Sequence, residues 1–76
     1  MENKKTIILN AKTDGLCGYV GFDHNGNRYE LYANNASEAI DMVRAAAKPP
    51  KSKKYLCSVH LCERADGTQV LQSTCF

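Results

Sequence analysis

The stretch that decides the fold runs from Gly18 to Ala47 and reads GYVGFDHNGNRYELYANNASEAIDMVRAAA. Asn25-Gly26 separates two segments of alternating character. This dipeptide is the strongest short-range signal for a two-residue hairpin loop, because a type I′ turn needs positive φ at both central positions. A helical pattern of apolar residues follows directly. We therefore predict two antiparallel strands and then an amphipathic helix.

A two-residue turn at Asn25-Gly26 also sets the pairing between the two strands. Side chains alternate between the faces of a strand, so one face of this hairpin is apolar and the other is mostly polar. The apolar pairs are Phe22–Tyr29, Val20–Leu31 and Gly18–Ala33, and the remaining pairs are Asp23–Arg28, Gly21–Glu30 and Tyr19–Tyr32. The register predicts that Phe22, Tyr29, Val20 and Leu31 pack under the helix, against Ile40 and Val43, and that Tyr19, Arg28 and Tyr32 lie on the uncovered face.

The helix has a clear start and a clear end. The side chain of Asn35 can accept from the backbone N–H groups of the first turn, and Glu38 supplies a box-like reciprocal cap. Pro49 and Pro50 end the helix, because the residue before a proline avoids the α region. Its apolar face consists of Ala36, Ile40, Val43 and Ala47, with Ala39 at the margin.

The rest of the chain predicts three further strands. The first covers Lys4 to Lys12, and the fourth covers Tyr55 to Glu63 with Tyr55 on its apolar face. Ala65-Asp66-Gly67 fits a three-residue turn with a G1 bulge, which leads into a fifth strand. This bulged register pairs Leu61 with Leu71, Val59 with Ser73, and Cys57 with Cys75.

These elements predict an α+β fold: one domain over residues 1–76, with an antiparallel sheet of about five strands (βββαββ) and one helix packed on one face. The strand after the helix either forms a right-handed crossover beside a parallel neighbour or joins the far edge of the sheet. Gly18 and Gly21 lie inside a strand, and they indicate a bulge or a close approach of the helix.

The composition excludes several classes of function. The net charge of +2 is too small to indicate nucleic-acid binding by itself. The apolar run Thr6–Leu9 is far too short for a membrane span or a signal sequence, so we expect a cytoplasmic protein. Cys17, Cys57, Cys62 and Cys75 show no C-x₂-C spacing, and we interpret them as free thiols rather than ligands of a metal.

No pattern in the chain supports catalysis. Cys62 and His60 share a strand face, but no third group is placed to orient them. No glycine motif that cradles a phosphate precedes the helix. We therefore predict no enzyme activity, no catalytic residue, no metal and no cofactor.

The most distinctive composition lies in the loop after the helix, where Lys48, Lys51, Lys53 and Lys54 make up four of the ten basic residues. This loop is either an electrostatic contact with phosphate or with an acidic protein surface, or a charged, stiff connector. Tyr19, Arg28 and Tyr32 on the uncovered face would stack bases, anchor a protein interface, or pack only against each other. These seven residues are the candidate binding residues.

A resemblance to known proteins suggests a biological role for these residues. The stretch from Ala47 to Val70, AKPPKSKKYLCSVHLCERADGTQV, resembles the C-terminal half of small uncharacterised bacteriophage proteins that carry a KPPKSK loop before a β-hairpin. The layout of one helix between two groups of strands is also similar to that of several small anti-CRISPR proteins. The resemblance implies an inhibitor in the host cytoplasm that binds a host protein or ribonucleoprotein complex. Single-stranded nucleic-acid binding is the alternative, and the oligomeric state stays open.

Overall fold

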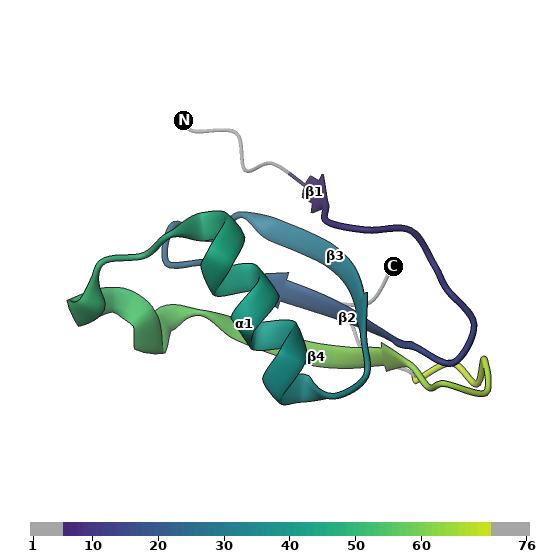
Figure 1. The fold of residues 1–76 in the computed structure, drawn as a ribbon. Helices are drawn as coiled ribbons and strands as arrows, with labels where there is room; N and C mark the ends of the chain where they lie inside the picture. Colours follow the sequence, from purple (N-terminus) through teal and green to yellow (C-terminus); the bar gives the residue numbers. More distant parts are fainter. Residues whose placement is uncertain (1–5, 71–76) are drawn as a thin grey trace.

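The computed structural model of the 76-residue chain describes residues 6–70. These residues form a four-stranded sheet with one α-helix on one face (Figure 1). The elements in chain order are β1 (Thr6–Ile8), β2 (Cys17–Phe22), β3 (Arg28–Ala33), α1 (Ala36–Ala47), the 3₁₀ helix η1 (Lys51–Leu56) and β4 (Ser58–Glu63). The predicted α+β class with one helix on one face is confirmed.

The sheet is mixed rather than wholly antiparallel. Its strand order is β1-β3-β2-β4, with β1 parallel to β3 and with β2 antiparallel to both of its neighbours. The connection through α1 therefore brings β4 to the edge of the sheet beside β2, which was one of the two arrangements left open. The first strand is shorter than predicted, and most of the predicted fifth strand lies outside the described residues.

The turn between β2 and β3 has three residues, so the predicted register is wrong by one position. The Asp23 N–H donates to the Asn27 carbonyl over 3.2 Å, the Gly26 N–H donates to the Asp23 carbonyl over 3.0 Å, and Gly26 has φ of 83°. This is a turn with a G1 bulge. The Asp23 carboxylate accepts from the N–H groups of Asn25 and Asn27, over 2.8 and 2.9 Å, and these bonds hold the longer loop.

The shift exchanges the two faces of β2. Tyr19 lies opposite Leu31 and Gly21 opposite Tyr29 on the face that α1 covers. Val20 and Phe22, which we predicted under the helix, instead lie on the other face beside Glu30 and Arg28. The positions of Tyr29 and Leu31 in the core are confirmed. On α1 the fully buried residues are Ala39 and Val43, whereas Ile40 is only partly buried at the margin of this core.

Each of the two glycines inside β2 is explained by one of the features that the sequence indicated, a close approach of the helix or a bulge. A Cβ on Gly21 would lie 2.6 Å from Val43 Cγ2, so α1 packs directly on the glycine backbone. The pairing of β2 with β4 shifts between Gly18 and Tyr19, which is the irregularity of a bulge. The close approach and the bulge are therefore confirmed, each at one of the two glycines.

The helix begins and ends where the sequence predicted, although the reciprocal bond expected between Glu38 and the cap residue is not formed. Asn35 is the N-cap, and its side-chain oxygen accepts from the Glu38 N–H over 2.8 Å. The Glu38 carboxylate reaches back to the backbone and side chain of Asn34 rather than to the cap residue itself. At the other end Lys48 adopts φ of 52° and its N–H donates to the Arg44 carbonyl over 2.8 Å.

The turn after β4 also has the predicted form. The Arg64 N–H donates to the Thr68 carbonyl over 2.9 Å and Gly67 has φ of 90°. Glu63 pairs with Gln69, the first pair that the bulged register requires. The predicted pairs of Leu71, Ser73 and Cys75 lie outside the described residues.

Candidate interaction surface

The lysine-rich stretch that the sequence placed in a loop contains the 3₁₀ helix η1. The Lys53 N–H donates to the Pro50 carbonyl over 2.8 Å and the Cys57 N–H donates to the Lys54 carbonyl over 3.1 Å. Every residue of η1 is exposed, and Lys48 just before it is exposed too. We call Lys48, Lys51, Lys53 and Lys54 the basic segment, and these four predicted site residues lie together.

No ion pair within the described residues neutralises the basic segment. Within residues 6–70 the ion pairs are Lys12–Glu63 and Arg28–Glu30, and neither involves one of its four lysines. The basic segment follows the end of α1 and precedes β4, so it lies at the same end of the molecule as the turn between β2 and β3 (Figure 1). The acidic residue of that turn is Asp23, which is buried and whose carboxylate accepts hydrogen bonds from the N–H groups of Asn25 and Asn27.

The opposite end of the sheet has mixed charge. Asp14, Glu38 and Asp66 lie there, in the turn before β2, in the first turn of α1 and in the turn after β4. Lys12 and Arg64 lie at the same end. The described part of the molecule is therefore polarised, with an end that carries unpaired positive charge and an end where both signs meet.

Two apolar side chains accompany the lysines in η1. Tyr55 is 77% exposed and Leu56 is 44% exposed. The prediction that Tyr55 begins a strand and faces the core is wrong, because the strand begins at Ser58 and the chain first turns inward at Cys57. Sequence analysis missed both residues as candidates, since the alternation of apolar residues through Cys57 and Val59 extends back to Tyr55 without a break.

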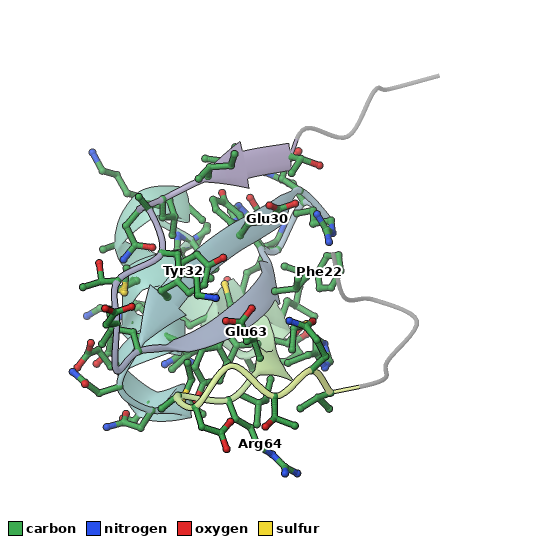
Figure 2. The ribbon with its side chains drawn as sticks, turned by 90° about the vertical axis from the view of Figure 1, so that its right-hand side faces the viewer. Phe22, Glu30, Tyr32, Glu63 and Arg64 are labelled. Atoms are coloured by element: carbon green, nitrogen blue, oxygen red, sulfur yellow. The ribbon has the colours of Figure 1, made fainter. Side chains whose placement is uncertain are left out.

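The other predicted site residues do not join the basic segment. Tyr19 is 6% exposed and lies under α1, so its placement on the uncovered face is wrong. Arg28 and Tyr32 do lie on the face away from α1, where Figure 2 shows Tyr32 beside Glu30 and Glu63. They are half-buried, and they lie four positions apart along β3, a separation of about 13 Å. The Arg28 guanidinium is paired with Glu30.

The face away from α1, which we call the outer face, is more closed than we predicted. Val20 is fully buried on it and Phe22 makes an edge-to-face contact with His60, with ring centroids 5.9 Å apart. Glu63 is also buried there. Lys12 Nζ lies 2.6 Å from its Oε1, and Gln69 donates to its Oε2 over 3.0 Å. These bonds from Lys12 and Gln69 lower the pKa of Glu63 against the opposing effect of burial.

A second buried carboxylate holds the hairpin together. The Tyr29 hydroxyl donates to Asp23 Oδ2 over 2.7 Å, and Asn27 Nδ2 donates to the same oxygen over 3.1 Å. Burial acts to raise the pKa of Asp23, but the hydrogen bonds from Tyr29, Asn27 and Asn25 outweigh burial and lower it. Burial, with the bond to Asp23, raises the pKa of Tyr29 to about 12. Sequence analysis did not identify this network.

The cysteines are arranged differently from the prediction of four free thiols. Cys17 and Cys57 are free, and Cys57 is buried in the core. Cys62 is disulfide-bonded, so the free-thiol interpretation is wrong at this position. The part of the chain from 6 to 70 contains no group of three His, Cys, Asp or Glu side chains that could hold a metal ion. None of its helices is long and apolar enough to cross a membrane.

Comparison with known proteins gives no independent assignment. No protein family, no curated protein and no solved structure matches the chain. The bacteriophage setting, the inhibitory role and the identity of a partner therefore stay predictions, and the surface itself has to support any proposal.

Proposed function

We propose that this chain is a non-enzymatic interaction protein that binds an anionic surface of a host protein or ribonucleoprotein complex through the basic segment. The observation that carries this proposal is the set of four exposed lysines at one end of the described molecule, none of them in an ion pair within residues 6–70. The role we propose is that of a phage-encoded, anti-CRISPR-like inhibitor in the host cytoplasm.

The physical basis of the proposal is electrostatic. Charges of one sign gathered at one end of a small protein steer an anionic partner toward that end and raise the rate of association. The attraction extends over about 8 Å at physiological salt. Because η1 is hydrogen-bonded at both ends, less conformational entropy is lost on binding than for an irregular loop. A partner held there is inhibited when its own function needs the occupied surface.

The decisive experiment reverses three charges at once. We expect Lys51→Glu, Lys53→Glu and Lys54→Glu together to abolish binding to the host complex that the wild-type protein retains in a pull-down. Each substitution is at an exposed position and should change the free energy of unfolding by no more than about 0.5 kcal/mol. Thermal melting of the triple variant checks that the fold is kept.

The matched control is the triple variant with arginine at the same three positions. It keeps the charge and should keep the binding. If the glutamate variant folds and binds as tightly as the wild type, the basic segment is a solvated connector and the proposal is wrong.

A second candidate function is direct binding of single-stranded nucleic acid. The exposed Tyr55 ring beside Lys53 and Lys54 favours it, because exposed aromatics next to cations stack bases while the cations contact phosphates. Titration with single-stranded DNA and RNA at two salt concentrations tests it. Strong binding that weakens steeply with salt supports this function, whereas no binding leaves the first proposal.

A further inference from the structure

We infer that Tyr55 and Leu56 form the apolar anchor of the basic segment, and that the partner is an acidic protein surface with an apolar pocket. The inference rests on the proposed function, since it names the kind of partner that the same surface takes. It goes further in assigning binding to two residues that are not charged and in choosing protein over nucleic acid.

The first observation is where the exposed apolar side chains lie. The large hydrophobic residues exposed within residues 6–70 are Ile8, Tyr55 and Leu56, and two of these three are adjacent in one turn of η1. Core packing does not use them, because η1 contains no buried residue. Their apolar surface is therefore free to be removed from water by a partner, which is a favourable contribution to binding.

The second observation is that the anchor is held in place before binding. The turn that carries Tyr55 is closed by the bond from Lys53 to Pro50 on one side and by the bond from Cys57 to Lys54 on the other. Cys57, directly after Leu56, is buried in the core. A side chain projecting from a fixed backbone loses less freedom on binding than one on an irregular loop.

The third observation distinguishes a protein partner from nucleic acid. Tyr55 is the one exposed aromatic residue in the described part of the chain, so no second ring is available to stack the next base of a strand. Leu56 offers no flat face for stacking. A tyrosine with an aliphatic neighbour, directly preceded in the chain by Lys53 and Lys54, instead has the character of a protein interface, in which apolar and charged side chains adjoin.

The test uses defined anionic polymers as probes. We would measure binding of the wild-type protein to poly-glutamate, to a glutamate–tyrosine copolymer of the same length, and to a 20-mer of thymidylate, all at one physiological salt concentration. We expect the copolymer, which adds apolar groups to the acidic chain, to bind about tenfold more tightly than poly-glutamate. We also expect it to bind more tightly than the oligonucleotide.

Single substitutions then assign the preference. Tyr55→Ala and Leu56→Ala should each reduce the preference for the copolymer while leaving the binding of poly-glutamate unchanged. Ile8→Ala is the matched control, because Ile8 is similarly exposed (69%) but lies on β1, away from η1, and this variant should keep the full preference. Circular dichroism spectra of all three variants check their folding.

The outcomes separate the two proposals. If Tyr55→Ala keeps the preference while the triple lysine-to-glutamate variant loses all binding, the apolar anchor is wrong and the basic segment stands. If the triple variant binds the polymers as the wild type does, the proposed function fails as well. Tightest binding to the oligonucleotide, weakened by Tyr55→Ala, overturns the protein partner in favour of nucleic acid. Failure to bind any of the three probes overturns both proposals.

Discussion

Gly21→Ala tests the close packing of α1 on the sheet, and its effect follows from a small number of distances. The added Cβ would lie 2.6 Å from Val43 Cγ2, 3.2 Å from the Ser58 carbonyl oxygen and 3.3 Å from Val59 Cγ1. The shortest of these distances is far inside van der Waals contact. Val43 is fully buried, and a valine in a helix has one strongly preferred rotamer, so we expect α1 to move away from β2.

The size of the effect can be estimated for the single and the double variant. Overpacking of this kind costs about 1–3 kcal/mol, and we expect Gly21→Ala to fall in the upper half of that range. Val43→Ala removes two buried methyl groups and should cost about 2 kcal/mol. In the double variant the shortest contact is gone, although those with Ser58 and Val59 remain. The second substitution should therefore partly relieve the first, with a coupling of about 1 kcal/mol or more.

Urea unfolding of the wild type, both single variants and the double variant measures this coupling. Distant substitutions usually add within about 0.5 kcal/mol, so a larger departure from additivity shows that the two sites interact. If the losses in the free energy of unfolding add within that limit, the Cβ of residue 21 does not meet Val43. The placement of α1 over Gly21, and with it the register of the hairpin, would then be refuted.

Three further predictions concern the core. The pKa of Asp23 is lowered in the folded state, so its contribution to stability should be present above about pH 4 and be lost as the pH falls through the lowered pKa. When the midpoint of urea unfolding is measured at a series of pH values, Asp23→Asn should therefore weaken its fall at acid pH. The pKa of Tyr29 is raised from 10 to about 12, so stability should fall as the pH rises between these values, and Tyr29→Phe should remove this alkaline limb. Ile40→Ala should cost about 2 kcal/mol, the low end for a buried isoleucine, because Ile40 is partly buried; a loss below about 0.5 kcal/mol would place it outside the core.

The elements could be predicted from the sequence where their signals are local. The Asn35 cap, the end of α1 before Pro49 and the bulged turn at Gly67 each depend on a few neighbouring residues, and the structure has all three. The glycines at 18 and 21 were also recognisable as irregular. Local signals do not report which strands become neighbours, so the mixed sheet and the parallel pairing of β1 with β3 were beyond them.

The hairpin shows how a strong local signal can be outweighed. Asn25-Gly26 favours a two-residue turn, but the loop has three residues because Asp23 accepts four hydrogen bonds, from Asn25, twice from Asn27 and from the Tyr29 hydroxyl. The bond from Tyr29 comes from the next strand, so it forms only together with the tertiary structure. A dipeptide preference does not contain this information.

That one-residue shift also changed the candidate site. In the predicted register Tyr19 was an exposed aromatic ring, whereas in the structure Tyr19 and Tyr29 are both packed in the core, and the Tyr29 hydroxyl donates to Asp23. Their presence in the sequence is therefore explained by folding. The same reasoning applies on the outer face, where Arg28 is paired with Glu30 and Tyr32 is half-buried.

What folding does not explain is the composition of η1. The backbone bonds from Lys53 to Pro50 and from Cys57 to Lys54 close its turns whatever the exposed side chains are, and none of its side chains is buried. Serine, glutamate or glutamine at these positions would connect α1 to β4 equally well and would not leave several positive charges together beside an exposed tyrosine. Since self-repulsion among the lysines and exposed apolar surface both cost stability, we expect residues of this kind to be retained for a partner. The proposed binding at this end of the molecule therefore predicts that substitutions in η1 change affinity far more than stability.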